Sequence, residues 1–197
     1  KRIVKQLDKV RVLYEELAPI FSTTADGKTP SPDELKALAE KNTVLLAEMN
    51  KAVKMYERVS KKTLKGDEAM AVVINLAGKQ RMLTQKMSKE CLLVYLDIDA
   101  SENRLNLRET SSLFDRTLKG LLDGDSVLDL PATSEPAIRN QLGTVSGLWT
   151  DFAPIIQKAC AEGESITEAD LTKLANDNLP LLKNMNAAVK MYEQQAK

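Results

Sequence analysis

An internal repeat constrains the fold of this chain more than any other feature of its sequence. The segment Leu13–Ile20 (LYEELAPI) matches Leu148–Ile155 (LWTDFAPI), and Met49–Glu57 (MNKAVKMYE) matches Met185–Glu193 (MNAAVKMYE). The first pair is offset by 135 positions (148 − 13) and the second by 136 (185 − 49), so the one-residue difference falls in the loop after residue 21. This period is too long for one solenoid unit and suits a whole helical module.

Apolar spacing and helix-breaking residues predict six helices. They span about residues 1–21, 31–62, 67–96, 101–122, 134–161 and 167–197. Gly66-Asp67 either separates the second helix from the third or lies within one continuous helix. Ser31 and Thr167 are predicted N-caps, each followed three residues later by a carboxylate. Short loops between long amphipathic helices predict antiparallel neighbours. The expected fold is all-α, with the third to sixth helices in an antiparallel four-helix bundle and the first two in an N-terminal helical hairpin.

The repeat also predicts the domain organisation. Residues 1–65 match the second half of a module, whereas residues 66–197 form a complete one. A hairpin cannot cover its own apolar face, so it must pack on the bundle, on a second subunit or on a further half-module. The offset predicts about 70 further residues before Lys1 in the precursor, containing a second copy of the third helix.

Composition excludes several classes of function. The 28 basic and 28 acidic residues cancel, which gives no support for nucleic-acid binding. The chain has no histidine, so histidine-dependent catalysis and His-ligated zinc sites are excluded. There is no Gly-rich phosphate loop, and no carboxylate pair outside ordinary helix surfaces. We therefore expect neither an enzyme nor a bound cofactor or metal.

Two further features bear on the cellular compartment. Cys91 and Cys160 could form one disulfide in an oxidising compartment, but two small buried thiols are the more frequent arrangement. No apolar run approaches the ~20 residues that cross a bilayer. No leader peptide is visible either. We expect a processed or excised segment whose contact with a membrane, if any, is made through segments outside this chain.

The third predicted helix has an arginine where a packed helix should be apolar. Taking every third or fourth residue gives a heptad-like seam of Ile74, Ala77, Arg81, Thr84, Ser88, Cys91 and Tyr95. A buried guanidinium needs an acceptor, and no Asp or Glu lies within one turn of Arg81 on this face. Its partner must come from another helix, another subunit or a bound anion. Met82, Leu83 and Met87 form the opposite stripe, which we expect to be core.

Residues 74–90 (INLAGKQRMLTQKMSKE), called here the signature segment, carry a family resemblance. The segment resembles the signature helix of the PilJ-type sensor domain, which lies outside the membrane in bacterial chemoreceptors. That domain is similar to the sensor domain of nitrate/nitrite-responsive histidine kinases. Lys79 departs from the arginine or serine common at its position, and we expect it to face solvent.

The resemblance implies a binding site. In the related nitrate/nitrite sensors, the arginine at the position of Arg81 comes from both subunits of a dimer, and the pair holds one anion on the symmetry axis. Asn75 and Ala77 match the motif, and they could supply an amide or leave room next to the anion. Gly78 would let two helices approach closely. Thr84 and Gln85 are neutral donors on the following turn. From composition alone, Arg81 would instead form an interhelical salt bridge or extend to solvent.

The resulting expectation is a periplasmic ligand-sensing domain that binds a small anion, nitrate or nitrite first, at a homodimer interface. The alternative is a soluble periplasmic helical module that binds a protein partner through the exposed hairpin.

Overall fold

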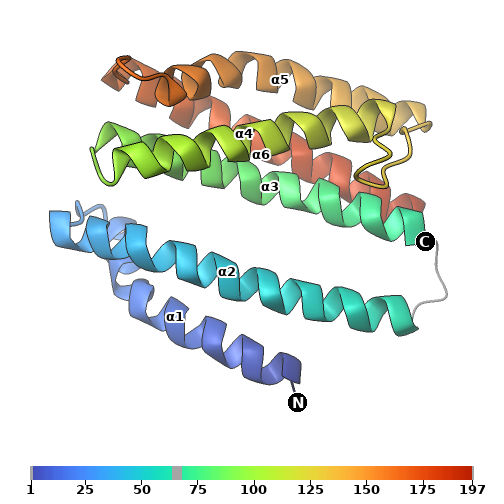
Figure 1. The fold of residues 1–197 in the computed structure, drawn as a ribbon, viewed down its shortest axis with the longest axis horizontal. Coiled ribbons are helices and arrows are strands. Elements are labelled where there is room, and N and C mark those ends of the chain that lie inside the picture. Colours follow the sequence, from blue (N-terminus) through green and yellow to red (C-terminus); the bar gives the residue numbers. More distant parts are fainter. Residues whose placement is uncertain (1, 64–67, 197) are drawn as a thin grey trace. The chain divides into compact units, whose positions relative to one another are not determined.

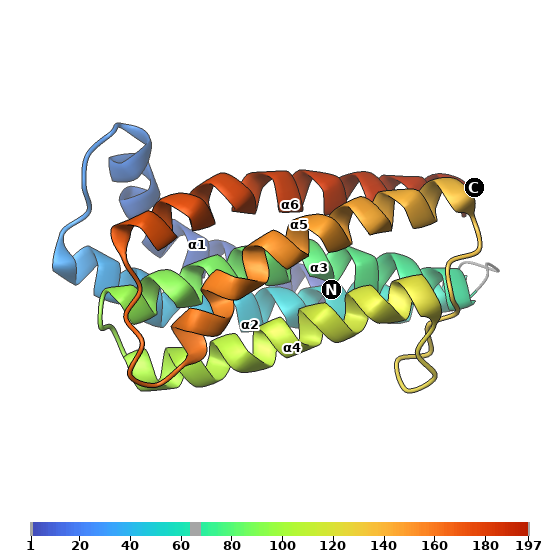
Figure 2. The same cartoon turned by 90° about the horizontal axis from the view of Figure 1, so that it is seen from above.

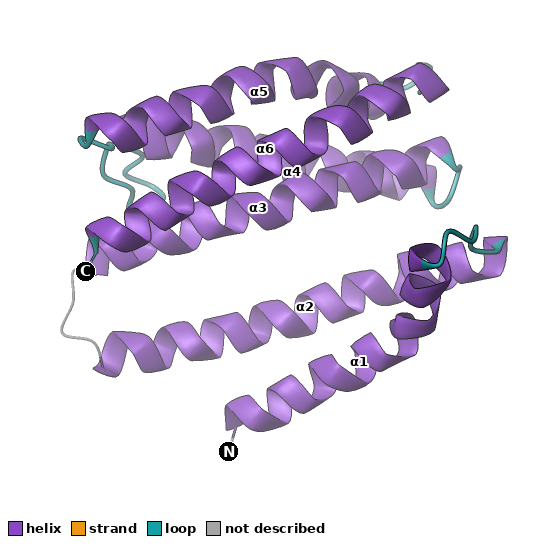
Figure 3. Cartoon of the chain, turned by 180° about the vertical axis from the view of Figure 1, so that it is seen from behind, coloured by secondary structure: helices purple, strands orange, loops and turns teal. Residues whose placement is uncertain are grey.

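The structure is a computed structural model that describes residues 2–63 and 68–196, except the side chains of residues 60–63. Its six helices are α1 (Arg2–Ala25), α2 (Pro32–Thr63), α3 (Glu68–Tyr95), α4 (Ala100–Asp123), α5 (Pro136–Cys160) and α6 (Glu168–Gln195). Loops connect α1 to α2 and join α3, α4, α5 and α6 in order, as Figure 3 shows. The prediction of an all-α fold is confirmed. The Gly66-Asp67 junction lies outside the described residues.

The chain divides into two compact units, Lys1–Gly66 and Asp67–Lys197. In the second unit α3 packs against α4 and α6, and α5 packs against the same two helices. The four helices run alongside one another with alternating direction (Figure 1 and Figure 2). This is the predicted antiparallel four-helix bundle. In the first unit α1 and α2 pack against each other as a hairpin. No helix of the described part of the chain is long and apolar enough to span a bilayer.

Local chemistry accounts for where the helices begin. Thr167 caps α6 in a capping box, in which its hydroxyl accepts from the Asp170 amide (3.2 Å) and the Asp170 carboxylate accepts from the Thr167 amide (2.8 Å). Ser31 and Glu34 make the same reciprocal contacts before α2, at 3.3 Å and 2.7 Å. Both predicted caps are thus confirmed. Each satisfies amide groups that the first helical turn leaves without partners.

The core of the second unit is aliphatic with one aromatic cluster. The ring centroids of Phe114 and Trp149 lie 4.7 Å apart, and those of Trp149 and Phe152 lie 6.1 Å apart. Leu83 and Met87 are buried as predicted, and Met82 is half-buried against the same cluster.

One prediction about α3 was wrong. Its seam is not a separate face opposite Met82, Leu83 and Met87. Ala77, Thr84 and Cys91 are buried in the same unit as Leu83 and Met87. The physical reason is that α3 packs against two neighbours, α4 and α6, and therefore buries a wide sector rather than a narrow stripe.

Both cysteines are free and buried, Cys91 in α3 and Cys160 in α5. Burial is the main cause that raises the pKa of the Cys91 thiol, to about 12, and it also raises the pKa of Cys160. We expect Cys91 in the native protein to react with iodoacetamide at pH 8 far more slowly than in urea, because the thiolate is the reactive form. Alkylation followed by mass spectrometry measures this. Equal rates in both states would contradict burial of the thiol.

The same shift predicts how stability depends on alkaline pH. The folded pKa of Cys91 lies above the ordinary thiol value of about 8.5, so the folded chain holds this proton more tightly than the unfolded chain. The contribution to stability is complete below about pH 8.5 and is lost as pH rises toward 12.

Candidate functional site

Arg81 lies on the flank of α3 that faces α6, at the edge of the buried sector. Its side chain is partly buried. The guanidinium Nη1 donates to the Asn186 side-chain oxygen on α6 at 2.6 Å, and Nε makes a long contact of 3.4 Å with the Gly78 carbonyl oxygen. Within residues 2–63 and 68–196, Arg81 forms no ion pair and its Nη2 makes no hydrogen bond. The charge is therefore held by neutral acceptors only.

This arrangement leaves the arginine with unused binding capacity. A guanidinium has five N–H donors in a planar fork that matches planar oxyanions. Here Nη1 and Nε are directed at protein oxygens, whereas Nη2 has no hydrogen-bond acceptor in the described part of the chain. A partly buried cation without an opposite charge gains from a bound anion, since charge out of water is costly when unpaired.

Gly78 lies one turn before Arg81 and borders its guanidinium. A Cβ built at position 78 would lie 3.5 Å from Arg81 Nη2, which is ordinary contact distance. Any side chain at this position would therefore occupy the space next to the unpaired nitrogen. The glycine keeps that side of the guanidinium open.

The remaining predicted site residues fall into two groups. Asn75 and Gln85 are exposed, and Gln85 donates to the Asn178 side-chain oxygen on α6 at 2.9 Å. Ala77 and Thr84 are fully buried, and the Thr84 hydroxyl donates to the Gln80 carbonyl at 3.0 Å. The structure thus brings Gly78 against Arg81 and turns Ala77 and Thr84 into the bundle.

Two asparagines of α6 belong to this surface and were missed by the sequence reasoning. Asn186 holds Arg81, while Asn178 accepts from Gln85 and donates to the Ser88 hydroxyl at 2.6 Å. One signal was available for Asn186, because Met-Asn occurs at the same place in both copies of the repeat. Nothing comparable pointed to Asn178.

Gln80 of the signature segment has a different role. It is fully buried, and its amide nitrogen donates to the Phe114 carbonyl of α4 at 2.8 Å. Its side-chain oxygen has no hydrogen-bond partner in the described structure. Gln80 therefore ties α3 to α4.

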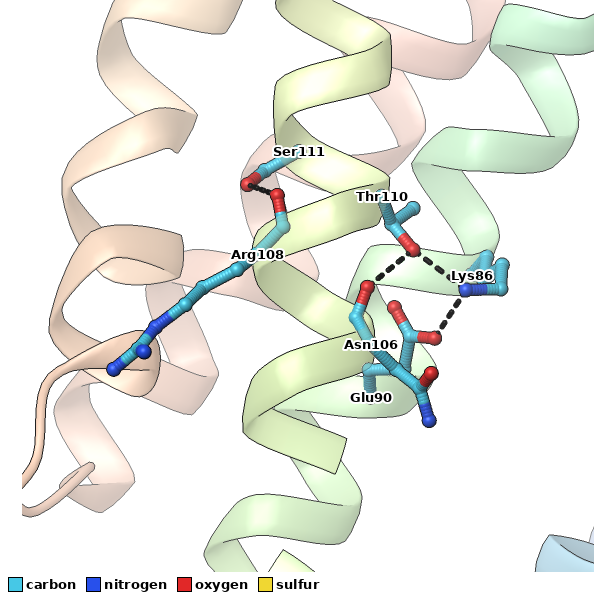
Figure 4. Close-up of polar contacts among 6 residues, drawn as sticks. All are labelled: Lys86, Glu90, Asn106, Arg108, Thr110 and Ser111. Carbon is cyan, nitrogen blue, oxygen red and sulfur yellow. Dashed lines mark hydrogen bonds and ion pairs between the residues drawn. The ribbon is translucent and has the colours of Figure 1, made fainter. Parts of the chain in front are cut away.

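A second polar cluster joins α3 and α4 further along the bundle. Figure 4 shows the Lys86 ammonium directed at both the Glu90 carboxylate and the Thr110 hydroxyl, whereas Arg108 points away. Arg108 instead donates to the Cys160 carbonyl at the end of α5. Glu90 is buried, and one of its oxygens has no partner among the described residues. The ion pair lies within α3, and the hydrogen bond from Lys86 to the Thr110 hydroxyl joins this helix to α4.

The family model PilJ, described as "Type IV pili methyl-accepting chemotaxis transducer N-term", matches residues 63–178. Among solved structures, the chain is similar to the ligand-binding domain of the Pseudomonas aeruginosa nitrate receptor McpN, with a TM-score of 0.54 and 24% identity. That match covers 64% of this chain and 97% of the other. No curated protein matches.

Proposed function

Because this chain belongs to the PilJ family, the N-terminal domains of type IV pili methyl-accepting chemotaxis transducers, we propose that it senses a small anion through Arg81. The family is one of receptors rather than of enzymes, so the task of such a domain is to bind a ligand and pass the event on. The observation that carries the proposal is a partly buried guanidinium held only by neutral oxygens.

Nitrate and nitrite are the ligands that we propose first. Both are small, planar and singly charged, and a guanidinium can contact two of their oxygens at once. McpN, whose ligand-binding domain shares this fold, is a nitrate receptor. The groups that contact Arg81, the Asn186 amide and the Gly78 carbonyl, are neutral, which suits an anion of single charge better than one of higher charge.

We propose further that two copies of the chain share one anion. The open side of Arg81 is only partly buried within one chain, and a second copy would complete its enclosure. Two guanidinium groups brought together without an anion would repel each other. An anion between them removes this repulsion, so binding would favour one packing of the two copies over another. A small shift of packed helices would then carry the signal.

The proposed location is outside the cytoplasm, in the periplasm of a bacterium. A receptor domain that reports on external nitrate must face the external solution. Its contact with the membrane would be made by segments outside this chain.

Titration calorimetry of the wild-type chain tests this function. Nitrate, nitrite, chlorate and acetate are added separately at constant ionic strength. We expect saturable heat with nitrate or nitrite and weaker binding of acetate, whose methyl group fills one vertex of the plane. Saturable binding of acetate alone would make the domain a carboxylate sensor. The absence of binding by all four would favour a helical module that recognises a protein partner.

A further inference from the structure

The α1–α2 hairpin repeats the α5–α6 hairpin in structure as well as in sequence. Shifted by 135 positions, Arg2–Ala25 corresponds to residues 137–160, and α5 is Pro136–Cys160. Helix α2 begins at Pro32 and α6 begins 136 positions later, at Glu168. The capping boxes of Ser31 and Thr167 are likewise 136 positions apart.

One partly buried pair of hydrogen bonds occurs at corresponding positions in the two hairpins. The Gln6 side-chain nitrogen donates to the Glu48 carbonyl at 2.8 Å and to the Glu48 carboxylate at 2.7 Å. At the corresponding positions, Gln141 donates to the Asn184 carbonyl and to its side-chain oxygen, both at 3.0 Å. The two hairpins therefore share helix register, and residues can be compared position by position.

This comparison identifies an apolar face on the first hairpin that the hairpin itself does not cover. We call it the hairpin face, and its members are between 39% and 52% exposed: Tyr14, Met49, Val53 and Tyr56. Their counterparts in the second unit are at most 9% exposed: Trp149, Met185, Val189 and Tyr192. There, α3 and α4 provide the cover. Trp149 packs against Phe114 of α4 with its ring tilted, and its indole nitrogen donates to the Asp115 carboxylate at 3.1 Å.

The polar residues of α2 indicate what kind of helix would cover this face. Asn42 and Asn50 stand 136 positions before Asn178 and Asn186, the two asparagines that bind α3. In α2 neither side chain has a hydrogen-bond partner in the part of the chain that the structure describes. The first hairpin thus has the apolar positions and the amides that α6 uses to hold the signature segment.

We propose that the hairpin face binds a second pair of helices of the α3–α4 type, supplied by another half-module of the same protein. In the complete module such a pair precedes the α5–α6 hairpin. The covering helix would place an arginine or another donor against Asn50, as Arg81 is placed against Asn186. This inference does not depend on Arg81 binding an anion.

Other occupants fit the face less well. The chain's own α3 and α4 already pack on α5 and α6. A second copy of the hairpin would bury the apolar residues, but Asn42 and Asn50 of one copy would then face the same asparagines of the other. They would lack the arginine and hydroxyl partners that α3 provides to Asn186 and Asn178. The matched positions of both polar and apolar residues favour a helix pair of the α3–α4 type.

Thiol labelling with a matched pair of variants tests the proposal. Val53→Cys lies in the hairpin face, and its counterpart Val189 is buried. Val44→Cys is the control, because Val44 is also exposed and its counterpart Pro180 is exposed too. Each variant is made in the 197-residue chain and in the complete protein expressed from its own gene, and both are treated with a polyethylene-glycol maleimide. Cys91 and Cys160 are buried and contribute little background.

In the 197-residue chain we expect both introduced thiols to react at similar rates. In the complete protein we expect the labelling rate of Val53→Cys to fall by a factor of about ten or more, because labelling would then require local opening. The labelling rate of Val44→Cys should not change. A photo-crosslinking residue at position 53 should join a helix outside residues 1–197. Equal labelling of the two thiols in the complete protein would overturn the proposal, as would a crosslink to α3 or α4 of this chain or to α1 or α2 of a second copy.

Discussion

Replacing Arg81 with alanine is expected to weaken nitrate binding about 100-fold or more. Each charge-assisted hydrogen bond contributes about 1.5–3 kcal/mol. If two copies share the anion, the substitution removes at least two such bonds, and about 1.4 kcal/mol corresponds to each factor of ten in affinity. Titration calorimetry of the variant under the wild-type conditions measures the loss. Binding unchanged in Arg81→Ala would remove this residue from the site.

Two further variants separate charge from geometry. Arg81→Lys keeps the positive charge but loses the planar fork, so we expect intermediate affinity. Arg116→Ala is the matched control, because Arg116 is an exposed arginine that already pairs with Asp125 through two contacts of 2.8 Å and 3.1 Å. It should bind nitrate as the wild type does. The bundle itself should tolerate Arg81→Ala, since the substitution removes a partly buried charge and only one short hydrogen bond.

The second large effect concerns stability. Lys86→Met leaves the buried Glu90 carboxylate without its cation, and breaking a buried ion pair in this way costs about 3–5 kcal/mol. We expect a value near the lower limit, about 3 kcal/mol, because the Lys86 side chain is 26% exposed whereas that of Glu90 is 2% exposed. The measurement is urea unfolding followed by the fluorescence of Trp149, the one tryptophan of the chain. Trp149 lies in the second unit, so the signal reports on that unit.

The double variant and a surface pair provide the controls. Adding Glu90→Gln to Lys86→Met removes the unpaired charge and should restore most of the lost stability. Lys173→Met breaks a pair with the same spacing on α6, where Lys173 is 50% exposed, and should cost about 0–1 kcal/mol. If Lys86→Met and Lys173→Met had equal effects, the Lys86–Glu90 pair would not be buried in solution.

Much of the fold could be predicted because it depends on local patterns. The helix limits follow from caps and breakers such as Ser31, Thr167 and Gly124, whose φ of 89° favours glycine. Leu83 and Met87 followed from helical spacing. The assignment of Ala77 and Thr84 to a seam opposite Leu83 and Met87 was wrong, because the width of the buried sector of α3 depends on how many helices surround it.

The partner of Arg81 could not be predicted for a related reason. Sequence showed that no acid stood within one turn, and therefore that the acceptor came from elsewhere. Asn186 is 105 positions away, and it meets Arg81 only because of the register between α3 and α6. That register is set by packing of the whole core, which no local pattern contains. The same limit applies to Gln80, whose contact with the Phe114 carbonyl depends on the register between α3 and α4.

Sedimentation velocity across a nitrate titration tests the shared anion most directly. A ligand that binds only the dimer shifts the monomer–dimer equilibrium by mass action. We expect the dimer fraction of the wild-type chain to rise with nitrate and that of Arg81→Ala to stay constant. A wild-type chain that binds nitrate while its dimer fraction does not change would contradict an anion held between two copies of Arg81.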